Sequence, residues 1–275
     1  MNHAPAVVLA ALLPLALSQP KDTAPPPAKH EQTAQPDEKK KEEKPANPAV
    51  VPVPRAEEGC KQRHERFNER AKQGHEKGDI DLIFMGDSIT EGWENAGKEA
   101  WAKHYGERHA VNCGIGGDET EHLLWRIQNG NLDGLDKPEP KDAKPPHLAV
   151  IMIGTNNLGN TRHFPEQTAE GVETVVKALR EKLPHTQVLL LAIFPRGEKA
   201  DDPLRQQVVK TNALIKPRLE SLKGVHYLDI GEKFMQKDGT ISRDIMPDLL
   251  HLSPQGYEVW AQAIEAKVHE LLGEK

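Results

Sequence analysis

Cysteine and aromatic residues are scarce in this sequence. Two cysteines in 275 residues cannot form a disulfide framework, and aromatic side chains make up only 4% of the chain. The net charge of −6 provides no positive field that would favour nucleic acid as a partner. A mean hydropathy of −0.65 excludes a multi-span membrane protein and is also low for a compact core. We therefore expect part of the chain to lie outside such a core.

Motifs for metals and nucleotides are missing as well. The sequence contains neither CxxC nor HExxH, and its 13 histidines are scattered without ligand spacing. The glycine-rich stretch Gly114-Ile115-Gly116-Gly117-Asp118 has neither the GxGxxG spacing of a dinucleotide site nor the GKS or GKT of a phosphate loop. The sequence thus predicts no metal and no cofactor.

The first 18 residues carry no Lys, Arg, Asp or Glu. Ala4 to Leu17 form an apolar run that is too short to span a bilayer but suits the hydrophobic region of a signal peptide. Ala16-Leu17-Ser18 places small residues where a signal peptidase cleaves, so residues 1–18 are predicted to direct export to the periplasm or the extracellular space. Because no Lys or Arg precedes the run, an uncleaved anchor stays open as the alternative.

Residues 19–56 hold nine of the 22 prolines and no Leu, Ile, Met or aromatic residue. The segment Lys39 to Lys44 adds charges of both signs. A segment of this composition buries too little apolar area to offset its ordering entropy, so we expect a disordered spacer. Residues 57–275 are long enough for one domain with a single core.

Within residues 57–275, short apolar segments alternate with helical patterns. Strands are expected at Ile80–Met85, Ala110–Cys113, Leu148–Ile153, Gln187–Ile193 and Val225–Leu228. Helices are expected at Lys98–Tyr105, Glu119–Gln128, Glu166–Leu183, Pro203–Leu222 and, after a Ser253 cap, Pro254–Leu272. This alternation predicts an α/β fold whose parallel sheet is covered on both faces.

Polar residues follow several of these strands. Ser88 follows the first strand, the glycine-rich loop with Gly117 follows the second, and Asn156 follows the third. Each has an ordinary structural explanation: Ser88-Ile89-Thr90-Glu91 fits a helix capping box, and glycine and asparagine are common in turns. Near the C-terminus, Asp248 and His251 have the i, i+3 spacing of a plain surface ion pair.

Taken together, these residues indicate acyl transfer. Ligands of open parallel sheets bind at the carboxyl ends of the strands, so the sheet gathers Ser88, Gly117 and Asn156 at one edge. Acyl transfer needs a nucleophilic hydroxyl, a base oriented by a carboxylate, and hydrogen-bond donors for the oxyanion.

Four sequence blocks resemble those of the SGNH (GDSL) hydrolases. They are Gly86-Asp87-Ser88, Gly114 to Asp118, Gly154-Thr155-Asn156-Asn157 and Asp248-x-x-His251. The likeness is greatest to the branch that resembles the catalytic subunits of intracellular platelet-activating-factor acetylhydrolase. It extends from about Asp79 to Leu272 and includes Leu124-Trp125-Arg126 and Pro195 to Lys199. The signal peptide and the spacer depart from that intracellular enzyme.

The resemblance implies a three-layer α/β/α flavodoxin-like fold with five parallel strands in the order 2-1-3-4-5. It also implies that Ser88 is the nucleophile, His251 the base and Asp248 the residue that orients His251. The backbone N–H groups of Ser88 and Gly117, with the side chain of Asn156, would then hold the oxyanion. Arg196 is a candidate for substrate binding, as is Asp87, although a salt bridge and a loop brace are the plainer interpretations.

The leading hypothesis is an exported serine esterase that removes short acyl groups, chiefly acetyl, from a carbohydrate or a similar polar ester. A phospholipid or lysophospholipid acylhydrolase is the alternative within the same chemistry. A non-catalytic polysaccharide-binding module and a metallophosphoesterase are the alternatives of other classes. The expected partner is the ester substrate, not nucleic acid, with no membrane span once the signal is removed; a homodimer is left open.

Overall fold

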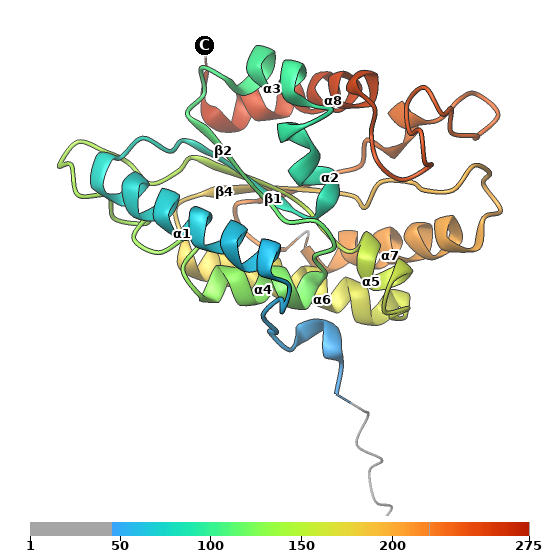
Figure 1. Ribbon diagram of the computed structural model, residues 1–275, viewed down its shortest axis with the longest axis horizontal. Coiled ribbons are helices and arrows are strands. Elements are labelled where there is room, and N and C mark those ends of the chain that lie inside the picture. Colours follow the sequence, from blue (N-terminus) through green and yellow to red (C-terminus); the bar gives the residue numbers. More distant parts are fainter. Residues whose placement is uncertain (1–45, 220, 275) are drawn as a thin grey trace, which may run out of the picture. The chain divides into compact units, whose positions relative to one another are not determined.

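A computed structural model describes residues 46–219 and 221–274 (Figure 1). The predicted signal peptide, residues 1–18, lies outside this part of the chain. Five parallel strands form one sheet in the order β2-β1-β3-β4-β5. The strands are Leu82–Gly86 (β1), Ala110–Gly114 (β2), Leu148–Met152 (β3), Gln187–Leu191 (β4) and Val225–Leu228 (β5). The predicted fold class and the implied strand order are both confirmed.

The strands bury side chains on both faces, because successive residues of a strand point to opposite sides of the sheet. In β1, Ile83 and Met85 belong to one apolar cluster, whereas Leu82 and Phe84 belong to the other. Every residue of β1 and β3 is buried. This two-sided burial explains why these strands are continuously apolar instead of alternating with polar residues.

Helices cover both faces of the sheet (Figure 1). One face packs against α1 (Glu58–Lys77), α4 (Thr120–Gln128), α6 (Pro165–Lys182) and α7 (Pro203–Leu219). The other packs against α3 (Lys98–Tyr105) and α8 (Pro254–Leu272). Ser253 caps α8 as predicted, since its side chain accepts a hydrogen bond from the backbone N–H of Gly256.

Five short helical elements complete the described part of the chain. They are α2 (Ser88–Glu91), α5 (Thr155–Gly159) and the 3-10 turns η1 (Pro48–Val50), η2 (Gly92–Glu94) and η3 (Gly231–Phe234). The first two of these, α2 and α5, begin directly after β1 and β3 respectively. They therefore lie where the carboxyl ends of neighbouring strands meet.

The structure differs from the expected spacer at residues 46–56, while residues 19–45 lie outside the described part of the chain. Ala49 is fully buried, and the Asn47 side chain donates to the carbonyl of Gln167 at 3.0 Å. The backbone N–H of Val53 donates to the carbonyl of Glu121. A proline-rich segment can follow a surface in extended form without secondary-structure hydrogen bonds. Composition alone therefore does not distinguish a proline-rich segment that packs on the domain, as residues 46–56 do, from a disordered spacer.

Both cysteines are free thiols, and Cys113, near the end of β2, is buried. Burial raises the pKa of Cys113 to about 11. None of the helices in the described ranges has the length and apolar character needed to cross a bilayer.

Candidate active site

Ser88 is the first residue of α2, directly after β1. Asp87, not Ser88, caps this helix: its Oδ1 accepts the backbone N–H of Ile89 at 2.9 Å. The alternative explanation of Ser88 and Glu91 as a capping box is therefore wrong. Glu91 instead accepts the N–H of Gly116 at 2.6 Å. Because Asp87 takes the cap, the Ser88 hydroxyl is available for another partner.

That partner is His251. The Oγ of Ser88 lies 2.9 Å from the Nε2 of His251, although the two residues are 163 positions apart in the sequence. The Nδ1 of the same ring lies 2.6 Å from the Oδ2 of Asp248. A hydroxyl, an imidazole and a carboxylate thus form one hydrogen-bonded chain, the arrangement that lets a ring accept a hydroxyl proton.

Asp248 and His251 lie in an irregular turn, not in a helical one. The Oδ1 of Asp248 accepts the backbone N–H groups of Leu250 and His251, at 3.0 and 2.7 Å. Leu249, between them, has a φ of +63°, which an L residue adopts only at a cost of roughly 1–2 kcal/mol. Its carbonyl accepts the N–H of Gly197, so the loop after β4 supports this strained turn. Strain of this kind is characteristic of functional sites.

Two carboxyl groups near Ser88, those of Asp248 and Asp87, have pKa values shifted in opposite directions. Burial by itself would raise the pKa of Asp248, but hydrogen bonds from His251 and Leu250 outweigh it and lower that pKa below its usual value. Asp87 is completely buried, and burial raises its pKa to about 7. Its Oδ2 has no hydrogen-bond partner within the described ranges. Asp87 therefore caps α2, and within residues 46–219 and 221–274 its side chain forms no hydrogen bond to Ser88, His251 or Asp248.

Two further predicted residues lie on the loops that flank Ser88. Because Gly86 of β1 is in register with Gly114 of β2 and with Met152 of β3, the loops after all three strands leave the sheet at one level. Asn156 lies in α5, and its Nδ2 donates to the carbonyl of Asp118 at 2.9 Å. Gly117 has a φ of +77°, which favours glycine at that position.

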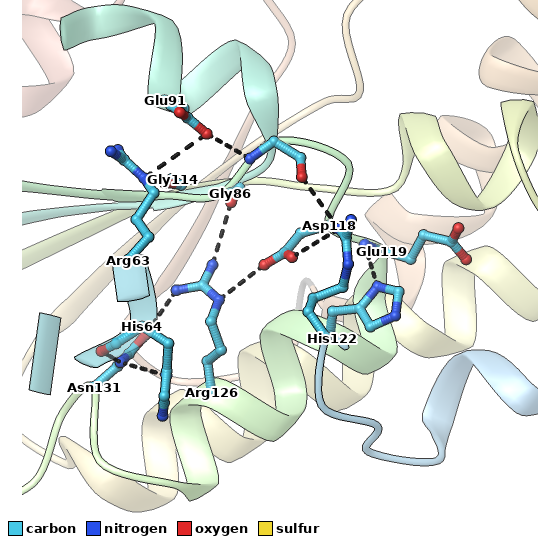
Figure 2. A network of polar contacts seen from close by, with 12 residues as sticks. Arg63, His64, Gly86, Glu91, Gly114, Asp118, Glu119, His122, Arg126 and Asn131 are labelled. Atoms are coloured by element: carbon cyan, nitrogen blue, oxygen red, sulfur yellow. Dashed lines mark hydrogen bonds and ion pairs between the residues drawn. The ribbon is translucent and has the colours of Figure 1, made fainter. Parts of the chain in front are cut away.

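Arg126 holds the glycine-rich loop through Asp118, the last residue of that loop (Figure 2). The Nε of Arg126 donates to the Oδ2 of Asp118 at 2.8 Å, and both side chains are almost fully buried. A second nitrogen of Arg126 donates to the carbonyl of Gly86 at 3.3 Å. One guanidinium therefore joins the end of β1 to the loop that carries Gly117.

Arg55 and Arg63 hold the same region from the N-terminal side. Arg55 donates to the carbonyl of Gly116 at 3.1 Å and lies 3.4 Å from Asp118. Arg63, on α1, donates to the carbonyl of Gly114 at 2.6 Å and lies 3.7 Å from Glu91 (Figure 2). It also pairs with Glu94. Sequence reasoning did not identify these two residues, because one lies in the predicted spacer and the other in a very polar helix without a motif.

Arg196, the other candidate for substrate binding, is held by hydrogen bonds to a neighbouring residue. Arg196 donates to the carbonyl and hydroxyl oxygens of Thr155, and it forms no ion pair within residues 46–219 and 221–274. Burial lowers its pKa below the usual value. Trp93 and Trp260 are fully buried in the cluster that contains α8, so they belong to the core.

Comparison with known proteins agrees with this fold. Residues 84–259 match the GDSL-like lipase/acylhydrolase family. The chain is 35% identical over 233 residues to the alpha2 subunit of platelet-activating factor acetylhydrolase IB from Gallus gallus, covering 83% of this chain and 93% of that protein. The human alpha2 subunit is 34% identical with the same coverage.

Solved structures show the same fold at lower identity. A GDSL-like lipase from Bacteroides thetaiotaomicron superimposes with a TM-score of 0.59 and 18% identity, covering 75% of this chain and 97% of that one. An acetylxylan esterase from Geobacillus stearothermophilus superimposes with a TM-score of 0.54 and 19% identity, covering 70% of this chain and 94% of that one. The chain belongs to the GDSL-like lipase/acylhydrolase family, also known as the SGNH hydrolases. It is accordingly a hydrolase that acts on esters.

Proposed function

We propose that this protein is a serine esterase in which Ser88 is the nucleophile, His251 the general base and Asp248 the residue that orients His251. The observation that carries the proposal is the continuous hydrogen-bonded chain from the Ser88 hydroxyl to the Asp248 carboxylate, with links of 2.9 and 2.6 Å. The lowered pKa of Asp248 keeps that carboxylate ionised, so it stabilises the protonated ring that forms during the reaction.

The reaction proceeds in two halves. The Ser88 Oγ attacks the ester carbonyl while its proton passes to the His251 Nε2, and the protonated ring then gives this proton to the departing alcohol. A water molecule releases the acyl group from Ser88 by the reverse sequence of proton transfers, which yields a carboxylic acid and the free enzyme. The N–H groups of Ser88 and Gly117 and the amide of Asn156 hold the oxyanion in each half.

The proposed substrate is a short acyl ester, chiefly an acetyl ester, of a carbohydrate or a similar polar alcohol. The side chains of His251 and Asp248 are 44% and 55% exposed, so a bulky polar ester can approach the triad. The names of the similar proteins support an acetyl group, since they include a platelet-activating factor acetylhydrolase and an acetylxylan esterase.

An acetylated phospholipid is the second candidate. It is favoured by the alpha2 subunits of platelet-activating factor acetylhydrolase IB, which are 34–35% identical to this chain over 93% of their length.

We also propose export through residues 1–18. N-terminal sequencing of the protein purified from its own cells tests this, with Gln19 expected first and Met1 as the contradicting result.

A panel of esters tests the substrate. The purified protein is assayed with acetylated xylan, acetylated monosaccharides, a short-chain 2-acetyl phospholipid, and p-nitrophenyl acetate, butyrate and octanoate. The highest kcat/KM is expected for an acetylated carbohydrate, together with acetate preferred over octanoate. A higher kcat/KM for the phospholipid replaces the carbohydrate proposal by the second candidate, whereas loss of all ester hydrolysis contradicts both.

A further inference from the structure

Three buried side chains outside the proposed triad converge on one point: Glu119, Glu121 and His163. Each has a potential ligand atom, and these atoms lie within 4.8 Å of one another. Glu119 directly precedes α4, Glu121 is its second residue, and His163 lies in the loop between α5 and α6. The three side chains remain only 4, 7 and 9% exposed. Because His163 is more than 40 positions from the two glutamates, the three residues form no short metal-binding motif in the sequence.

A second layer of polar groups fixes these side chains. The Nδ2 of Asn157 donates to Glu121 at 2.8 Å and lies 3.2 Å from the Nδ1 of His163. The Thr161 hydroxyl donates to Glu119 at 2.9 Å. The bonds to the two carboxylates are of the kind that orients metal ligands and is important for affinity. An ion bound at the Nδ1 of His163 would replace the contact of that nitrogen with Asn157.

The two carboxyl groups of the cluster have no cationic side chain as a direct partner among the described residues. Neither Glu119 nor Glu121 forms an ion pair with a Lys or Arg in residues 46–219 and 221–274. Two neighbouring buried carboxylates require a proton or a cation between them. His163, which is nine-tenths buried and turned into the same cluster, adds a nitrogen ligand that a shared proton does not require.

We propose that Glu119, Glu121 and His163 bind a divalent first-row transition metal ion, with Zn²⁺ the preferred probe. Two carboxylates and one imidazole form an open three-ligand set that suits Zn²⁺ or Mn²⁺, whereas Mg²⁺ and Ca²⁺ prefer oxygen ligands alone. This proposal is independent of the esterase mechanism, in which the ion has no step.

The position of this cluster suggests what the ion does. Glu119 is two residues from Gly117, while Asn157, which donates to Glu121, is next to Asn156. The ion would therefore connect the loop after β2 to the segment after β3, the two loops that carry the proposed oxyanion donors. Because the ion binds only the folded arrangement, it also stabilises the native state.

Isothermal titration calorimetry with ZnCl₂ on the metal-stripped full-length protein tests the site. We expect about one ion per chain, together with a concentration-dependent rise in the melting temperature. Glu121→Gln and His163→Asn should each weaken zinc binding by more than about 10-fold, since even outer-shell changes cost 10–100-fold. Glu121→Gln keeps an oxygen for Asn157 and removes a buried charge, so this variant should fold.

Two matched controls separate this site from other histidines and carboxylates. Glu166→Gln and His185→Asn change the same residue types at exposed positions and should leave zinc binding unchanged. A melting temperature that rises with zinc equally in the wild type and in Glu121→Gln overturns the proposal. Absence of saturable zinc binding in the wild type also overturns it, and leaves a shared proton between Glu119 and Glu121. Neither result bears on ester hydrolysis.

Discussion

The side-chain amide of Asn156 donates a hydrogen bond to the backbone carbonyl of Asp118 at 2.9 Å. This bond joins the segment after β3 to the loop after β2 and fixes the orientation of the amide. An amide nitrogen carries two hydrogens, and the bond uses one of them. In the proposed mechanism the other donates to the oxyanion, so the same side chain positions the loop and binds the developing charge.

Replacing Asn156 by Ala should therefore lower kcat by about 10²–10³-fold, which corresponds to roughly 3–4 kcal/mol. The KM should change little, because the lost bond forms mainly in the transition state. Steady-state kinetics with p-nitrophenyl acetate measure both parameters. Unchanged kcat would remove Asn156 from the proposed oxyanion hole.

Arg126 should be essential for stability because it pairs with Asp118 in the interior. The two side chains are 2% and 0% exposed, so Arg126→Met leaves a buried carboxylate without its main partner. We expect a loss of about 3–5 kcal/mol in the free energy of unfolding, measured by urea denaturation. Arg70→Met is the matched control, since its pair with Asp79 is partly exposed and should contribute less than about 1 kcal/mol. Equal losses in the two variants would contradict this assignment.

Asp87 should make stability depend on pH. Because burial raises its pKa from 3.8 to about 7, the folded state retains a proton that the unfolded chain releases at lower pH. The resulting stabilisation is complete below pH 3.8 and is lost as the pH rises to about 7. Asp87→Asn keeps an oxygen that can cap α2 but cannot ionise.

Relative to the wild type, this variant should gain roughly 2–3 kcal/mol in the free energy of unfolding between pH 5 and pH 8. Urea denaturation of both proteins at the two pH values measures the difference. A constant difference would show that Asp87 does not titrate in this range.

Much of the fold could be predicted from the sequence, because apolar runs followed by glycine mark buried strands. Four of the five predicted strands agree with the structure to within two residues at each end, and Val225–Leu228 agrees at both ends. Helix α1 was not predicted. Its buried positions are only Arg63, Phe67, Ala71 and Gly74, too few apolar residues to produce a recognisable stripe.

The residues of the candidate site that directly follow strands could be predicted from the sequence. Those whose role depends on a partner from a distant segment could not. Strand order brings the loops of Ser88, Gly117 and Asn156 together, and these positions follow from topology. Arg55 could not be found, because its role depends on a proline-rich segment that packs against the Gly116 carbonyl. The Ser88–Glu91 capping box failed for a similar reason: Glu91 bonds to Gly116, a residue on another loop.

The central claim is that Ser88 is a nucleophile activated by His251, and covalent labelling tests it most directly. The protein is treated with a fluorophosphonate, and the modified residue is located by peptide mass spectrometry. One adduct on Ser88 is expected, with no adduct in Ser88→Ala, much slower labelling in His251→Ala, and no hydrolysis of p-nitrophenyl acetate by Ser88→Ala. Full hydrolysis by Ser88→Ala, or a wild-type protein that remains unlabelled at Ser88, would contradict the claim.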